Sequence, residues 1–416
     1  MTRFRLATIL AAIGLAMPFA GSAQESPGTF KIPGTDSTIK FYGYAQLDMT
    51  VDFGARVGDI ENNDWATVLF AVPADGTVIE KHKKPQLYMT ARTSRFGIQT
   101  NTPTSIGDIG VKIEADFNGP NGFQSETFTN SVLFRLRHAY GTFGGLLTGQ
   151  TWSTFLDLAA YPDVVDFNGP GTIALVRNPM IRYTLALAPG VSLALAAENA
   201  RGAQFGGTKF QTLPDFHANL GYSASWGSVS LRGVTQYFRE QPTATLANGD
   251  VVEIDADAHS KFTVAGAASG SFKVAGDTLV LQFSGGPGIG RYLLNAGGTG
   301  GSGAGAYAID ANGDLDLWTV LGAHAGYTHV WNSQFRSNLV GAGTWILDTN
   351  VNGAAATNNV QKDLYQGFVN TFWTFAKNAS FGLEFTYGIW RSFTNGTPQL
   401  KGHEYRVNSS FHYNFF

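Results

Sequence analysis

The stretch SVLFRLRHAYGTF, from Ser131 to Phe143, decides the fold because its side chains alternate between two chemically different faces. Successive side chains of a β-strand point to opposite sides. The predicted faces are Val132, Phe134, Leu136, His138 and Tyr140 on one side, and Leu133, Arg135, Arg137 and Ala139 on the other. Such a strand suits a transmembrane barrel, with lipid against the aromatic face and water against the arginine face.

A long segment without strand alternation follows. A glycine turn at 144–145 leads into a short strand, LLTGQTW, and then into STFLDLAAYPDVVDFNGPGTIALVRNP, from Ser153 to Pro179. Connections of this length are usually functional or disordered. This one carries apolar residues that predict packing: Phe155, Leu156, Leu158, Tyr161 and Phe167. We therefore predict an external loop that folds back into the lumen of the barrel.

The rest of the chain predicts more strands of the same kind. IKFYGYAQLDMTVDF, from Ile39 to Phe53, alternates over its whole length, which exceeds the usual soluble strand of ~5–6 residues. It suits a tilted transmembrane strand of ~9–11 residues with some overhang. The predicted strands are 39–53, 86–99, 107–118, 131–143, 146–152, 179–188, 191–201, 215–226, 228–239, 259–271, 274–284, 315–331, 334–349, 362–376, 380–393 and 402–416. The sequence thus predicts an all-β fold, a transmembrane antiparallel β-barrel of about 16 strands.

The connections alternate in length, as expected when short turns lie in the periplasm and longer loops outside. Tight turns are predicted near 144–145, 189–190, 227, 331–332 and 377–378, with long segments between them. The last strand, EYRVNSSFHYNFF, is amphipathic and ends in Phe416. A terminal aromatic residue on such a strand resembles the signature of outer-membrane barrels.

The N-terminus predicts secretion. Arg3 and Arg5 precede an apolar run from Leu6 to Ala20, and Gly21-Ser22-Ala23 resembles a cleavage site, so residues 1–23 are expected to be a signal peptide. Residues 24–38 would be a short periplasmic lead-in, and 39–416 the barrel. No later apolar run is long enough for a transmembrane helix. A closed barrel is then the remaining way to cross a membrane, because lipid cannot satisfy an open sheet edge.

Composition narrows the function. The chain has 416 residues, no cysteine, 14% charged and 13% aromatic residues, and 51 glycines. The absence of cysteine excludes disulfides and thiolate metal sites. The formal net charge is −3, and loss of Arg3 and Arg5 leaves 26 basic against 31 acidic residues, which is −5. Nucleic acid is not expected as a partner, because no basic stripe is present.

Several motifs resemble trimeric bacterial porins. TSRFGIQTNTP, from Thr93 to Pro103, and FRLRHAYGTFGGLLTGQTWSTF, from Phe134 to Phe155, are similar to early strands and the third-loop entry of that family. FKIPGTDSTIKFYGYAQLDMTVDFG, from Phe30 to Gly54, and GQTWSTFLDLAAYPDVVDFNGP, from Gly149 to Pro170, resemble DcaP-like outer-membrane porins. The resemblance implies a bacterial outer-membrane location, a homotrimer and a preference for dicarboxylates.

Charged residues on the predicted lumen wall and loop are the candidate site. An inward loop narrows a barrel, and the charges on the loop and on the facing wall then set selectivity. The acidic candidates are Asp157, Asp163 and Asp166, and the basic candidates are Arg92, Arg95, Arg135, Arg137, Arg177, Arg182 and Arg232. Arginine can grip a carboxylate through two parallel hydrogen bonds. These arginines could equally pair with Glu114, Asp116 or the loop aspartates and hold the loop in place.

Three functions stay open at this point. The first is a porin for passive diffusion of small hydrophilic solutes that prefers small anions such as dicarboxylates. The second is a general or cation-leaning porin. The third is a barrel enzyme, for which no catalytic constellation is present, so no enzyme, cofactor or metal is predicted. Gly298, Gly300 and Gly303 match a nucleotide-binding glycine pattern without its strand–turn–helix context. DANGDLD, at 310–316, lacks the glycine and glutamate positions of a calcium loop.

Overall fold

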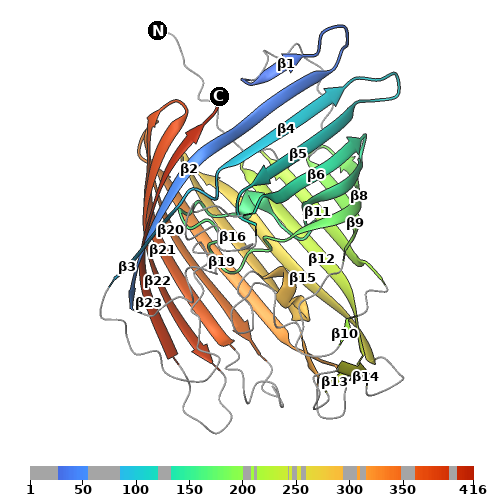
Figure 1. Cartoon of the computed structure of the whole chain (residues 1–416), viewed down its shortest axis with the longest axis vertical. Helices are drawn as coiled ribbons and strands as arrows, with labels where there is room; N and C mark the ends of the chain where they lie inside the picture. The colour runs from blue at the N-terminus through green and yellow to red at the C-terminus, as the bar shows by residue number, and fades with distance from the viewer. Residues whose placement is uncertain are drawn as a thin grey trace.

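The computed structural model shows a closed antiparallel β-barrel (Figure 1). It describes residues 27–54, 85–119, 133–199, 208–209, 213–241, 243–245, 251–253, 259–293, 307–309, 315–347, 361–392 and 401–416. Within these ranges, each strand pairs with its neighbour along the chain, and the last strand pairs with the first. The barrel therefore has sixteen strands, as the sequence predicts. The predicted signal peptide and the glycine pattern at 298–303 lie outside the described residues. The DANGDLD stretch at 310–316 lies largely outside them.

The barrel strands begin and end close to the predicted bounds. They are β2 (Thr38–Gly54), β3 (Gln86–Thr90), β4 (Arg95–Thr102), β5 (Ile109–Asp116), β6 (Arg135–Phe143), β7 (Leu146–Trp152), β8 (Arg177–Ala188), β9 (Val191–Glu198), β11 (Asp215–Ala224), β12 (Gly227–Gln241), β15 (His259–Val274), β16 (Asp277–Pro287), β19 (Thr319–Val330), β20 (Phe335–Ile346), β21 (Gln361–Ala376), β22 (Ala379–Ser392) and β23 (Lys401–Asn414). β3 and β4 count as one strand of the barrel, because both pair with β2 and only residues 91–94 separate them.

Smaller elements extend or fill the barrel. They are β1 (Thr29–Lys31), β10 (Thr208–Lys209), β13 (Thr243–Thr245), β14 (Val251–Glu253), β17 (Tyr307–Ile309), β18 (Leu315–Leu317) and two 3-10 helices, η1 (Leu158–Ala160) and η2 (Ile289–Tyr292). β1 lies in the predicted lead-in and pairs with the start of β2. None of the described helices is long and apolar enough to cross a membrane.

The two faces of the wall differ in chemistry as predicted for β2. Phe41 and Phe53 are exposed on its outer face, whereas Asp48, Thr50 and Asp52 are buried on the inner face. Other outward residues are also apolar, and aromatic pairs such as Phe335 with Trp373 and Trp226 with Phe272 stack near strand ends. This arrangement has an apolar belt outside and a polar lumen inside, as in outer-membrane barrels.

A β-bulge corrects the predicted faces of the opening strand. Glu114 of β5 pairs with His138, but Ala115 pairs with Leu136, so Arg137 is one extra residue in β6. Phe134 and Leu136 are 54% and 46% exposed on the outside. His138, in contrast, is buried on the inside and bonds Thr151. The prediction that His138 and Tyr140 share the face of Phe134 was wrong, because an extra residue shifts the alternation by one.

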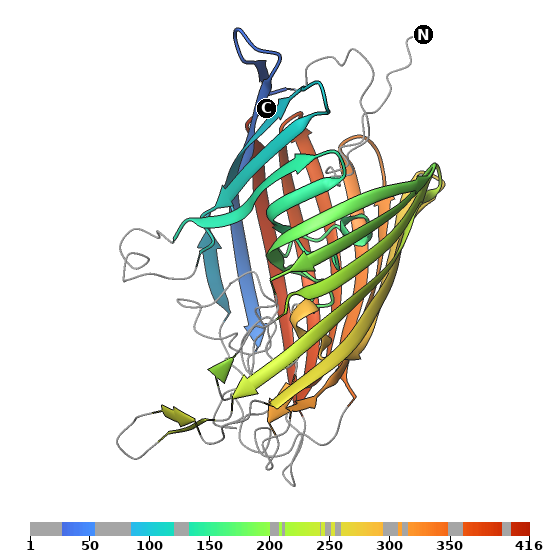
Figure 2. The same ribbon diagram turned by 90° about the vertical axis from the view of Figure 1, so that its right-hand side faces the viewer.

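Short turns gather at one end of the barrel (Figure 2). The connections 103–108, 144–145, 189–190, 225–226, 275–276, 331–334 and 377–378 lie at that end, near the C-terminus. The connections at the opposite end are longer, which confirms the predicted rhythm. Residues 153–176, between β7 and β8, lie inside the barrel against the walls, and we call them the inner segment (Figure 1).

Candidate functional site

The inner segment is held at its start and at its middle by buried carboxylates from opposite walls. Glu198, at the end of β9, accepts the backbone N–H of Thr154 at 2.7 Å. Glu384, on β22, accepts the backbone N–H groups of Val165 and Asp166 at 2.9 and 3.0 Å. Hydrogen bonds to charged groups are stronger than neutral ones and contribute about 1.5–3 kcal/mol each. These two glutamates therefore fix where the segment enters and crosses the lumen.

Further wall side chains bond the backbone of the inner segment. Arg232 donates to the carbonyl of Phe155, and Gln366 accepts the N–H of Gly171 at 2.8 Å. His324 lies 2.9 Å from the carbonyl of Ala160, and its other ring nitrogen lies 2.8 Å from the Thr172 hydroxyl. Gln282 and Asn370 donate to the carbonyls of Thr172 and Asp163. The segment is thus tied to at least six strands, which makes it a fixed part of the lumen.

One side of the lumen is filled by an apolar core. Its members come from the inner segment, from η2 and from the facing strands: Phe155, Leu156, Ile173, Ala174, Val234, Ala265, Ala267, Ile289, Tyr292, Leu293, Trp318, Val320 and Ile346. On the other side of the inner segment lies an open cavity of about 1130 Å³. The open space is therefore displaced toward strands β2 to β12 and β20 to β23.

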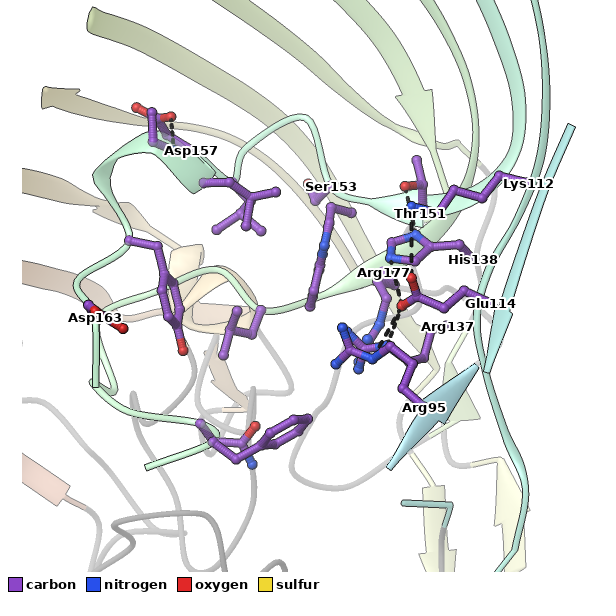
Figure 3. A pocket seen from close by; sticks show the side chains of 18 of the residues that line it. Arg95, Lys112, Glu114, Arg137, His138, Thr151, Ser153, Asp157, Asp163 and Arg177 are labelled. Carbon is purple, nitrogen blue, oxygen red and sulfur yellow. Dashed lines mark hydrogen bonds and ion pairs between the residues drawn. The ribbon is translucent and has the colours of Figure 1, made fainter. Parts of the chain in front are cut away.

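The described residues that line this cavity carry more positive than negative charge. The basic ones are Lys40, Arg95, Lys112, Arg135, Arg137, Arg177, Arg182 and Arg336, and the acidic ones are Glu114, Asp157, Asp163 and Asp166. With every one of these side chains counted as ionised, eight basic against four acidic side chains leave a formal excess of four positive charges. Figure 3 shows the basic cluster on the wall, with Asp157 and Asp163 across the cavity from it. Eight of the ten predicted site residues line the cavity, and Arg92 and Arg232 do not.

Three of the predicted arginines are paired with wall carboxylates. Arg135 bonds Asp116 through two nitrogens at 2.9 and 2.8 Å. Arg137 bonds Glu114 at 2.7 Å and Asp116 at 3.0 Å. Arg95 lies 3.5 Å from Glu114. The alternative that these arginines pair with Glu114 and Asp116 is therefore confirmed for them, and three guanidinium groups face two carboxylates.

Arg177 is the basic residue without a described carboxylate partner in this cluster. Its guanidinium lies 4.3 Å above the ring of Trp152, and its Nη1 has no hydrogen-bond partner. A cation over an indole face gains electrostatic attraction without losing its charge. Lys40 and Arg182 also form no ion pair with a described carboxylate. These three cations are the ones whose charge is left for a solute.

The three predicted aspartates of the inner segment have different roles. Asp157 accepts a hydrogen bond from Ser269, and Asp163 forms an ion pair with Arg336 of β20. Asp166 is buried, and burial raises its pKa to about 8. Arg406 lies 3.6 Å from Asp166 but bonds Asp52 more closely, so it offsets only part of this effect. Asp166 is therefore protonated near neutral pH, and Asp157 and Asp163 remain as the acidic side of the cavity.

Some site residues were not among the candidates. Lys40 and Lys112 stand on the polar faces of predicted strands, so alternation alone could have found them. Arg336 follows a predicted turn, and nothing in the sequence indicates that it meets Asp163. Glu198 and Glu384 lie in ordinary strand patterns, and their contacts with the inner segment depend on the closed barrel. In the part of the chain that the structure describes, no cluster of His, Cys, Asp or Glu is arranged to hold a metal ion.

A sixteen-stranded barrel with a polar lumen, an apolar belt and a charged cavity defines an outer-membrane porin channel. Residues 14–415 match the model of the family described as DcaP outer membrane protein, so the chain belongs to that family of the bacterial outer membrane. Its fold matches the crystal structure of the outer membrane channel DcaP of Acinetobacter baumannii, with a TM-score of 0.73 and 25% identity over 93% of this chain and 99% of that one.

More distant porins share the fold. The anion-selective porin from Comamonas acidovorans aligns with a TM-score of 0.53 and 12% identity, over 91% of this chain and 100% of that chain. The trimer form of OmpT of Vibrio cholerae gives a TM-score of 0.53 and 12% identity over 91% and 99%. Porin Omp2b of Brucella suis biovar 1 (strain 1330) is 25% identical over 225 residues, 50% of this chain and 54% of that protein. The chain thus spans about half the length of the curated relatives it matches.

Proposed function

We propose that this porin conducts small hydrophilic solutes passively and prefers small anions such as dicarboxylates. The observation that carries the proposal is the formal excess of four positive charges among the described residues lining the cavity. Because the inner segment crosses the lumen there, every solute would pass within reach of these charges. Fixed charges of one sign along a constriction favour ions of the opposite sign.

The negative net charge of the chain does not contradict this preference. At physiological ionic strength, charges more than about 8 Å away are largely screened. Acids outside the lumen therefore act weakly on a solute in the constriction, whereas the arginines that line it act directly. Local charge, rather than the formal −3 of the whole chain, is expected to set selectivity.

The cations form a series along the wall toward the short-turn end. Strand pairing places Arg95 level with Tyr44 and, through Asp116, with Arg135. Four residues further along β2, Lys40 is level with Gln99 and Lys112. At about 3.3 Å per residue, the two levels are roughly 13 Å apart. A diacid could therefore leave the level of Arg95 and Arg135 and be received by Lys40 and Lys112 before it exits.

Three further assignments belong to this proposal. Residues 1–23 would be a signal peptide, and 24–38 a short lead-in before the barrel. The functional unit would be a homotrimer, supported by exposed apolar side chains on the outer wall and by the trimer form of a porin with this fold. The protein would act as a channel, not as an enzyme. Mass spectrometry of the mature protein and its molar mass in detergent would test the first and second of these.

Current block by a diacid tests the solute preference. Succinate, added to one side of a planar bilayer containing the purified protein, is expected to interrupt chloride current in a concentration-dependent way. Butyrate is a matched control, because it has the same carbon number and one carboxylate. Equal effects of the two acids would contradict a site for diacids, and block by neither would leave a general porin.

A further inference from the structure

A short segment from a different connection fills the apolar side of the lumen. Residues 288–293, which contain η2, follow β16, and we call them the η2 wedge. Ile289, Tyr292 and Leu293 are each 0% exposed. Complete burial of three large apolar side chains outside the strands is unusual for a connecting segment, since connections mostly run over the surface.

The wedge reaches across several strands of the wall. At its start, the N–H of Gly288 donates to the carbonyl of Trp318 at 2.9 Å. Leu293 packs over β19 at Gly322, where an added Cβ would come within 3.0 Å of the leucine Cδ2. At the far side, the Tyr292 hydroxyl donates to Asp215 of β11 at 2.6 Å. The wedge therefore bridges from β19 to β11 on the inside of the barrel.

Arg291 extends this bridge to β8. Its Nη2 donates to the side chain of Asn178 at 2.8 Å and to the carbonyl of Asn199 at 2.9 Å. Asn178 in turn donates to Glu198, the carboxylate that holds Thr154. The wedge is thus linked through one hydrogen-bonded chain to the entry of the inner segment.

The wedge also packs directly against the inner segment. The ring of Tyr292 lies 5.4 Å from that of Phe155, and Ile289 and Leu293 belong to the same apolar core as Ile173. No residue of the wedge lines the open cavity. Water and solute are therefore kept off this side of the lumen by apolar packing from two separate connections.

We propose that the η2 wedge is a selectivity-determining element, because it confines the solute path to the arginine-bearing side of the lumen. A fixed charge is largely screened beyond about 8–10 Å at physiological salt. If the apolar side were open, ions could pass beyond this distance from Arg177 and would not be sorted by the charges that line the cavity. Apolar side chains of the wedge would then control ion selectivity as strongly as the arginines that line the cavity do. The sign of selectivity rests on the proposed function, whereas confinement of the path does not.

The test makes the apolar side of the lumen accessible to water and leaves every charged residue unchanged. The double variant Ile289→Ser, Leu293→Ser replaces two buried apolar side chains with small polar ones that admit water. Single-channel conductance is expected to rise on the order of twofold, since a second path is added, and the reversal potential in a salt gradient is expected to move toward zero. Ile106→Ser is the matched control, because Ile106 is a highly exposed residue of a short turn and its loss leaves the lumen unchanged.

The outcomes separate this inference from the proposed function. A wild-type channel that selects cations would contradict the proposed function, yet the double variant should still conduct more and select less. Unchanged conductance, or higher conductance with an unchanged reversal potential, would overturn the inference. If the double variant does not form a barrel, Leu293→Ala makes a smaller opening, and a smaller change in both quantities in the same direction is expected.

Discussion

Loss of the Glu384 carboxylate should release the inner segment from the wall. This carboxylate accepts the N–H groups of Val165 and Asp166, and it also accepts from Asn370 and Asn408. Each of the two backbone bonds to a charged acceptor contributes about 1.5–3 kcal/mol. Taking the lower value for both, Glu384→Ala weakens docking by about 3 kcal/mol. At about 1.4 kcal/mol per factor of ten, the undocked population rises roughly 100-fold.

Thiol labelling can measure this release, because the chain has no cysteine of its own. Val165 is 7% exposed when docked, so Val165→Cys provides a single buried thiol on the inner segment. Its rate of reaction with a water-soluble methanethiosulfonate should rise roughly 100-fold in the Glu384→Ala background. Glu384→Gln keeps one acceptor oxygen and should give an intermediate rate.

Asp108→Ala serves as the control, because Asp108 bonds Asn101 in a short turn away from the inner segment. That variant should leave the labelling rate of the buried thiol unchanged. An unchanged rate in Glu384→Ala, or an equal rise in the control, would refute the view that this carboxylate holds the segment.

Further predictions concern the charges of the cavity. Arg177→Gln should lower anion selectivity, because one unpaired charge contributes about 1 kcal/mol at 4 Å in water, or up to about fivefold in anion partitioning, and the reversal potential in a salt gradient measures it. Arg336→Gln, which leaves Asp163 unpaired, should lower anion selectivity, and Asp163→Asn should raise it, with little change in stability because this partly exposed pair contributes at most about 1 kcal/mol. The raised pKa of Asp166, about 8, means that the docked segment holds a proton that the released segment, with a pKa of about 3.9, loses first. Docking of the inner segment should therefore be firmest below about pH 4, weaken as the pH rises to about 8, and then level off. Labelling of the buried thiol relative to an exposed thiol measures this dependence. Asp166→Asn should remove it.

The barrel was predictable because its strands follow one local rule, the alternation of polar and apolar side chains. Alternation with a period of two, tight turns between strands and a terminal aromatic strand are all readable along the chain, and together they predicted the number of strands. The same rule placed Arg95, Arg135, Arg137 and Arg182 toward the lumen, where the structure finds them.

The rule failed where the structure departs from strict alternation. In the run Arg135-Leu136-Arg137-His138, the sequence does not indicate which residue is extra, because charged and apolar residues alternate through the bulge. The pairing of Glu114 and Asp116 on β5 with these arginines decides it, because both guanidinium groups must face inward to reach the carboxylates.

Contacts across the lumen were beyond sequence reasoning for a different reason. Glu198 and Glu384 look like ordinary polar strand residues, and they become anchors because closure of the barrel brings each one to the inner segment. The η2 wedge was likewise not predictable, because it lies in a glycine-rich connection that carries no strand pattern. Arg232 was predicted as a wall charge but proved to be an anchor for Phe155, since its distance from the cavity depends on where the segment folds.

The most direct test of the central claim is the reversal potential of the purified protein in a planar bilayer under a potassium chloride gradient. The claim is that local charge in the lumen outweighs the negative net charge of the chain. It predicts a reversal potential with the sign of anion selectivity, which moves toward zero in Arg177→Gln. A clear cation-selective potential, unaffected by that substitution, would contradict it.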